Sequence, residues 1–230
     1  MEKEQNWLNN RCGYISASEL GDLVSASGKI IDTNVSYIRK KRFERKHGYA
    51  LPVSSRPMEI GKKTEPTIFE WLKAHSDRTD LVYAQDLEVI PFWKVDWAKF
   101  GASPDCFSAD EKNVFEFKTL VGNEATEFFM DEYTSNDEKK ERVWKEHGNQ
   151  LLGQFLSNNK VDSITVVKYA PKLEYVERDV DSPMAEWRGL MFTFNRADYV
   201  QELENMRNRI IMFDKFIDST ENPKDLKKAL

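Results

Sequence analysis

Acidic and basic side chains gather in two neighbouring segments, and their types suit metal-assisted chemistry. Asp105 follows one predicted strand, and Glu116 and Lys118 lie in the next. Because strand side chains alternate between faces, Glu116 and Lys118 share one face, while Phe115 and Phe117 give the other face a core side. We expect Asp105 to end a hairpin partner of that strand, so that two carboxylates converge on a hard divalent cation such as Mg²⁺. An adjacent lysine can orient a water or stabilise developing negative charge, as phosphodiester hydrolysis requires.

The residues alone leave a plainer interpretation open, because Glu-Lys alternation is ordinary on an exposed strand face. Three further groups favour hydrolysis: a third carboxylate on a predicted helix, two glutamines one helical turn apart, and an arginine with two serines at a helix start that would make a phosphate pocket. Each also has an ordinary alternative, as a solvated acid, a surface amide or a helix N-cap. The groups are Glu65; Gln150 and Gln154; and Arg11, Ser16 and Ser18.

The composition is that of a chain able to build a hydrophobic core. Its 230 residues are 40% hydrophobic and 12% aromatic, which excludes disorder. Its two cysteines, Cys12 and Cys106, exclude a disulfide scaffold and a four-cysteine metal site. The net charge of −5 argues against a uniformly basic coat protein, but not against an enzyme with a local basic surface. We expect a single domain over residues 1–230, in the cytoplasm and without a membrane partner.

Hydrophobic periodicity predicts a mixed order of helices and strands. This order indicates an α/β or α+β fold, with a small mixed sheet flanked by helices. Helices are expected from Glu19, over 35–46, 58–74 and 145–157, and over 183–217 after Ser182; strands are expected over 82–90, 99–103, 113–118 and 163–169.

Several motifs follow one another in a fixed order along the chain. They are R-x-G-x-I-[ST]-A-S-E at Arg11–Glu19, G-K-x-x-E at Gly61–Glu65, S-P-D at Ser103–Asp105, E-x-K at Glu116–Lys118, the glutamines at Gln150 and Gln154, and the strand end Tyr169-Ala170-Pro171. In this order the chain resembles the phage lambda exonuclease and YqaJ-type viral recombinase family, a branch of the PD-(D/E)xK nucleases. The resemblance is strongest over residues 5–170 and implies a restriction-endonuclease-like core.

The resemblance implies a role for each matching position. Asp105 and Glu116 would be metal ligands with the Phe117 backbone carbonyl as a third, Lys118 the catalytic lysine, Glu65 a ligand of a second metal or its water, and Gln150 a neighbour of the attacking water. Arg11, Ser16 and Ser18 would bind a 5′-phosphate. Two departures stand out. The glutamines are four residues apart, so Gln150 or Gln154 could be the functional one, and Cys106 replaces the family's usual glycine.

A basic run lies on the predicted helix over 35–46. Six cations fall within eight positions, which are Arg39, Lys40, Lys41, Arg42, Arg45 and Lys46. In an arbitrary protein such a run is a solvated helix face. For a nuclease, we expect it to contact DNA backbone phosphates.

The resemblance predicts a metal-dependent 5′→3′ exonuclease on double-stranded DNA. It would use Mg²⁺, with Mn²⁺ able to substitute and two ions per site, and act in phage or prophage recombination with a single-strand annealing protein. The family forms ring-shaped homo-oligomers, often trimers. The alternatives are a PD-(D/E)xK endonuclease of restriction or repair and a non-catalytic DNA-end-binding module. The pocket around Arg11 argues against the endonuclease, and the set of Asp105, Glu116 and Lys118 argues against the module.

Overall fold

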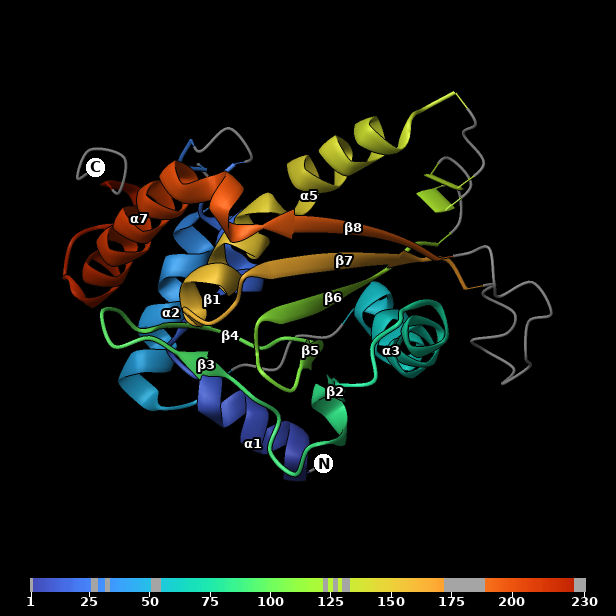
Figure 1. Ribbon diagram of the computed structural model, residues 1–230. Helices are drawn as coiled ribbons and strands as arrows, with labels where there is room; N and C mark the ends of the chain where they lie inside the picture. The colour runs from blue at the N-terminus through green and yellow to red at the C-terminus, as the bar shows by residue number, and fades with distance from the viewer. Residues whose placement is uncertain are drawn as a thin grey trace.

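The computed structural model describes residues 2–25, 29–31, 34–50, 55–121, 124–125, 128–129, 133–171 and 189–225. In these residues, the larger of two β-sheets has five strands, with helices packed on both faces (Figure 1). β6 and β7 are parallel, and the other neighbouring strands are antiparallel. The strand order is β2 (Leu81–Tyr83), β5 (Cys106–Ser108), β6 (Asn113–Thr119), β7 (Ser163–Tyr169) and β8 (Gly189–Asn195).

A smaller three-stranded sheet joins the N-terminal segment to the chain before Asp105. β1 (Ile15–Ser16) pairs in parallel with β4 (Phe100–Ala102), and β3 (Trp93–Lys94) pairs antiparallel with β4 on its other side. Each strand is only two or three residues long. The sheet nevertheless holds the segment around Ser16 next to β4, which precedes Asp105 in the sequence.

The two faces of the five-stranded sheet carry separate hydrophobic cores, because side chains alternate along its strands. Phe115 and Phe117 pack with side chains of helix α3 (Arg56–His75). Val114 and Val166 belong to the core formed with α5 (Asn136–Ser157) and α7 (Val200–Asp218). α3 accordingly lies on the opposite side of the sheet from α5 and α7 (Figure 1). The helices are α1 (Glu2–Arg11), α2 (Asn34–His47), α3 (Arg56–His75), α5 (Asn136–Ser157) and α7 (Val200–Asp218), with 3₁₀ turns η1 (Ala17–Asp22), η2 (Ala84–Asp86), η4 (Arg196–Tyr199) and η5 (Pro223–Asp225).

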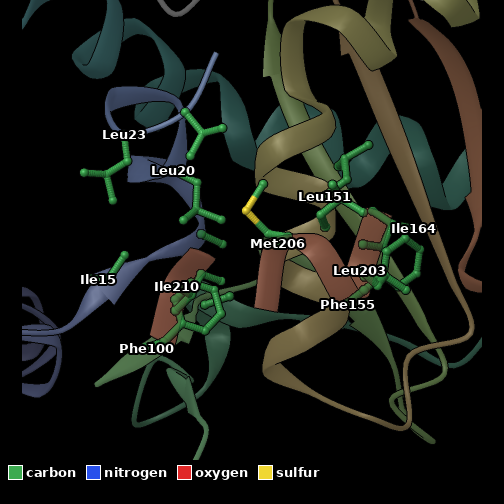
Figure 2. Packing of buried hydrophobic residues seen from close by; sticks show 14 of the residues in the cluster. Ile15, Leu20, Leu23, Phe100, Leu151, Phe155, Ile164, Leu203, Met206 and Ile210 are labelled. Carbon is green, nitrogen blue, oxygen red and sulfur yellow. The ribbon is translucent and has the colours of Figure 1, made fainter. Parts of the chain in front are cut away.

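The larger core joins α5, α7 and the N-terminal segment. Leu151 of α5 lies beside Met206 and Leu203 of α7, with Leu20 of η1 facing the same cluster (Figure 2). All four side chains are buried. Full burial of one such side chain contributes about 1.5–3 kcal/mol, so this core fixes α5 firmly over the sheet.

The expected mixed α/β fold, a small mixed sheet flanked by helices, is confirmed. The strand predicted over 163–169 is β7, and the helices predicted over 35–46, 58–74 and 145–157 are α2, α3 and the second half of α5. Pro66 lies inside α3. In the described residues, no helix combines the length and the apolar character needed to cross a bilayer.

Other expected elements differ from the structure. The strand predicted over 82–90 ends at Tyr83, where η2 begins. The segments 99–103 and 113–118 do not pair: β4 belongs to the smaller sheet, and the hairpin partner of β6 is β5. The helix predicted over 183–217 is replaced at residues 189–195 by β8 and begins at Val200, while Ser182 and Pro183 lie outside the described residues.

Candidate functional site

Glu116 and Lys118 form the centre of a polar cluster on the α5 face of β6. The Lys118 ammonium donates hydrogen bonds to Glu116 Oε1 at 2.8 Å and to Gln150 Oε1 at 3.0 Å. The Gln150 amide donates to the same Glu116 oxygen at 2.6 Å, and the Gln154 amide donates to Glu116 Oε2. Glu116 is buried. Both glutamines therefore hold this carboxylate, and Gln150 alone of the two also contacts the lysine.

Asp105 reaches the same place from the chain just before β5. The Phe117 amide donates to Asp105 Oδ2 at 2.8 Å. The pairing of β5 with β6 ends at Cys106 opposite Phe115. The Asp105 side chain therefore accepts a hydrogen bond from the Phe117 N–H that a longer β5 strand would have paired. The N–H and C=O of one strand residue point to the same side, so the Phe117 carbonyl also faces the Asp105 side. Cys106, where glycine was expected, is buried in the α3-side core and removes none of these contacts.

Glu65 of α3 adds a third carboxylate to this centre. Burial, and then the negative charge of Glu116, raise the pKa of Glu65 to about 7, although the Tyr83 hydroxyl donates a hydrogen bond to it. Burial, followed by Glu116 and Glu65, raises the pKa of Asp105 well above its usual range. Burial works to lower the pKa of Lys118, but Glu116 and Asp105 raise it overall. The structure thus gathers three carboxylates around one ammonium.

This excess of negative charge fits a divalent cation by donor type. No three His, Cys, Asp or Glu side chains within the described ranges are spaced to bind one ion together. Mg²⁺ commonly takes one or two protein carboxylates and completes its octahedron with water and substrate phosphate. Asp105 and Glu116 with the Phe117 carbonyl fit that pattern. One buried polar atom beside them, Gln154 Oε1, has no hydrogen-bond partner in the described part of the chain.

The three residues predicted to bind a phosphate lie together. Arg11 donates to Ser16 Oγ at 2.8 Å, and the hydroxyls of Ser16 and Ser18 are 3.2 Å apart. The Arg11 guanidinium also lies 4.4 Å from the centre of the Trp7 ring. The Trp7 indole N–H in turn donates to Ser103 Oγ at 2.9 Å, which connects the pocket to the chain two residues before Asp105.

Ser103 and Trp7 had not been predicted to be part of this pocket. The position of Ser103 in the S-P-D motif was the available signal, because any residue so close to Asp105 must lie near the carboxylates. Trp7 is four residues before Arg11, one helical turn away on α1, so the two side chains share a helix face.

The Glu19 carboxylate holds the residues of the Arg11 pocket in place. Glu19 accepts from the Ser16 amide at 3.2 Å and from the Ser16 hydroxyl at 2.8 Å, so Ser16 also begins η1 as the N-cap that one interpretation expected. Burial would raise the pKa of Glu19, but Lys41, Arg11 and Lys40 lower it to about 2. Lys40 and Lys41 pair with this carboxylate at 3.3 and 3.1 Å.

Two arginines of the basic run on α2 contact the C-terminal helix. Arg42 donates to the backbone carbonyls of Phe216 and Ile217 in the last turn of α7 and of Glu221 after it. Arg45 donates to the Gly13 carbonyl and to Asp214 and Asp218. These guanidiniums hold the C-terminal helix, and their contact with DNA stays a prediction. Lys40 is engaged with Glu19, as described above. Arg39 and Lys46 are exposed, and their contact with DNA stays a prediction.

The chain matches the model of the YqaJ-like viral recombinase domain over residues 6–156. No curated protein matches it. Its fold is similar to an alkaline exonuclease from Laribacter hongkongensis, LHK-Exo, with 15% identity, a TM-score of 0.61, and 93% of this chain and 94% of that chain covered. A structure of LHK-Exo in complex with dAMP gives 16% identity and a TM-score of 0.62 over the same shares of the two chains.

A phage-related exonuclease from Haemophilus somnus 129PT has the same fold. It is 15% identical, with a TM-score of 0.61, and 90% of this chain and 96% of that chain are covered. Identities this low show the fold alone, and the fold is the restriction-endonuclease-like one expected from the motifs. The family follows from the matched domain, which spans more than half of the chain. The chain therefore belongs to the YqaJ-like viral recombinases.

Proposed function

We propose that the chain is a Mg²⁺-dependent 5′→3′ exonuclease on double-stranded DNA ends. The observation that carries this proposal is the connection between the two sites. The Arg11 pocket is joined through Trp7 to Ser103, and Ser103 stands two residues before Asp105. A pocket for a terminal phosphate directly beside a hydrolytic centre favours an enzyme that cuts from an end.

The chain's own residues divide the chemistry between them. Asp105, Glu116 and the Phe117 carbonyl would hold one ion, and Glu65 a second ion or its water; Mn²⁺ has similar ligand preferences. The ions would neutralise phosphate charge and lower the pKa of a bound water. Lys118 supplies a fixed positive charge beside Glu116, suited to the negative charge that develops during hydrolysis. Gln150 holds that ammonium in place, because its amide oxygen accepts a hydrogen bond from Lys118 while its amide nitrogen donates one to Glu116.

The proposal extends to the setting in which the enzyme acts. As in the family it resembles, the chain would form a ring-shaped homo-oligomer, a trimer, that encloses duplex DNA. It would work with a phage single-strand annealing protein in the cytoplasm of a bacterial host. LHK-Exo, which shares the fold, has been solved in complex with dAMP, and this supports a nucleotide-binding centre in the fold.

The test compares linear with closed circular duplex, each with Mg²⁺ or EDTA, using linear ends labelled at the 5′ or the 3′ terminus. The expected result is Mg²⁺-dependent loss of the linear 5′ label alone. Cleavage of closed circles would instead assign an endonuclease, binding of ends without cleavage would assign a non-catalytic module, and early loss of the 3′ label would reverse the polarity.

A further inference from the structure

Lys94 lies on the same sheet face as the phosphate pocket. In the three-stranded sheet, Ser16 is paired with Gly101, and Gly101 is paired with Lys94. Residues directly opposite one another on neighbouring strands project to the same face. Ser16 and Lys94 therefore stand on one face, two strand spacings or about 10 Å apart.

The space between these two residues is filled by an aromatic ring. A Cβ on Gly101 would lie 2.8 Å from the Phe92 Cζ atom and 2.7 Å from the Trp93 carbonyl oxygen, so the Phe92 ring covers the glycine. The Tyr14 ring meets Phe92 edge-on, with 5.7 Å between centroids. The Lys94 ammonium lies 4.6 Å from the Tyr14 centroid and 6.0 Å from that of Phe92. The lysine is thus held beside the pocket by two rings.

No carboxylate of the described residues forms an ion pair with Lys94, in contrast to several cations of α2. Lys40 and Lys41 form ion pairs with Glu19, and Arg45 pairs with Asp214. Lys94 is exposed, and the rings are the contacts that the described residues give it. Cation–π contacts orient an ammonium without removing its charge, so it remains available to an anion.

We propose that Lys94 binds a backbone phosphate of the strand whose 5′ end occupies the Arg11 pocket, at the first or second internucleotide linkage. This inference rests on the proposed function for the location of that end. Tyr14 and Phe92 act as positioning residues that hold the ammonium at a fixed distance from Ser16. The contact extends the pocket from a single phosphate to a short stretch of backbone, supplied by a loop and strand outside the basic run of α2.

The first experiment measures binding of a fluorescent 5′-phosphorylated duplex in EDTA over a series of salt concentrations. Lys94→Gln should weaken binding about tenfold, as for one lost charged hydrogen bond, and lower the log–log salt slope by about 0.9. Lys94→Arg should restore both. The matched control is Lys73→Gln, because Lys73 also lies over a ring, 5.2 Å from Phe69, but pairs with Glu70 at 2.9 Å. An unchanged slope for Lys94→Gln would overturn the proposal.

The second experiment locates the phosphate. A neutral methylphosphonate is placed at each of the first three linkages from the 5′ end. Substitution at the first or second linkage should weaken wild-type binding but leave Lys94→Gln unchanged, because the variant has already lost that contact. Losses that simply add at every linkage would contradict the assignment. Binding is measured without metal, so failure of the wild type to cleave DNA would refute the proposed function and leave this readout intact.

The third measurement tests the rings. Phe92→Leu keeps apolar volume over Gly101 but removes the ring, and should reproduce part of the salt-slope loss in wild type. In a Lys94→Gln background it should add nothing to that loss. A further loss in the double variant would show that Phe92 acts on DNA independently of Lys94, and the positioning role would be wrong.

Discussion

Gly153 of α5 rests directly on Ala17 of η1: a Cβ on the glycine would lie 2.8 Å from the Ala17 Cβ. One turn before, α5 carries Gln150, which holds Glu116 and Lys118. η1 follows directly on Ser16 of the phosphate pocket. This close contact therefore sets the position of the hydrolytic centre relative to the pocket.

Gly153→Ala should test that contact. The added methyl overpacks the interface, which costs about 1–3 kcal/mol, and displaces Gln150, so cleavage falls along with the melting temperature. The control is Gly61→Ala in α3, where a Cβ meets nothing within 4 Å. That change should stabilise by about 0.5–1 kcal/mol. Calorimetry and digestion rates measure both, and a Gly153→Ala protein with full activity and stability would contradict the packing.

Asp105→Asn and Lys118→Met should separate metal binding from catalysis. Asp105→Asn removes a proposed ligand and should weaken Mn²⁺ binding in calorimetric titration as well as abolish cleavage. Lys118→Met should lower the cleavage rate about 10²- to 10³-fold, the cost of one group that stabilises transition-state charge, while Mn²⁺ still binds. Substantial Mg²⁺-dependent cleavage by both variants would refute the site.

Arg11→Ala should discriminate between chain ends. A terminal phosphate carries more charge and one more free oxygen than an internal one. Loss of a charged hydrogen bond, worth about 1.5–3 kcal/mol, should slow initiation about ten- to a hundredfold on 5′-phosphorylated duplex. On 5′-hydroxyl duplex the variant should lose much less, since the partner is already absent. Equal initial rates of wild type on the two ends would argue against the pocket.

Arg42→Ala should affect stability and leave DNA binding alone. Arg42 donates to the carbonyls of Phe216 and Ile217 in the last turn of α7 and to that of Glu221 just after the helix. Losing these bonds should cost about 1–3 kcal/mol, measured by urea unfolding, with an unchanged salt slope for DNA. Arg39→Ala, on the exposed side of α2, should change stability by less than about 0.5 kcal/mol. A lower salt slope for Arg42→Ala would reinstate it as a phosphate contact.

Glu19 should make the free energy of unfolding depend on pH in the acid range. Its pKa is about 2, against an ordinary value of 4.5, so its ionised form favours the folded state. This stabilisation is complete above pH 4.5 and is lost as pH falls toward about 2; the shift corresponds to about 3 kcal/mol. Glu19→Gln should be less stable than wild type at pH 7, and the difference should narrow below pH 4.5. A difference that stays constant with pH would exclude this origin.

Long, regular elements were predictable from sequence, and short ones were not. β7 was predicted over 163–169 from its β-branched content, and the structure buries all but its first residue. β1 and β3 have two residues each, too few to show a period of two, and their pairing depends on β4. β8 did carry a signal, since Phe192 and Phe194 are buried between exposed neighbours, but an expected helix start upstream masked it.

The sequence indicated which residues belong to the candidate site better than it indicated how they are arranged in space. Motif order selected Asp105, Glu116 and Arg11, because the chemistry restricts the residue types at those positions. For the basic run on α2, a count of cations could not show that Arg42 and Arg45 point to α7 carbonyls and carboxylates. The contact of this run with DNA stays a prediction. Lys94 gave no local signal, because its place beside Ser16 arises from pairing between strands far apart in the sequence.

Pro104 alone separates Ser103, which contacts the end pocket through Trp7, from Asp105. Two peptide units span at most about 7 Å, and proline locks one of the angles between them. If the proposed function is right, this tripeptide fixes the distance between the pocket that holds the 5′ end and the phosphodiester bond that is cut. The length of the released fragment is then set by a fixed covalent distance in the protein, and it does not depend on the base sequence of the DNA.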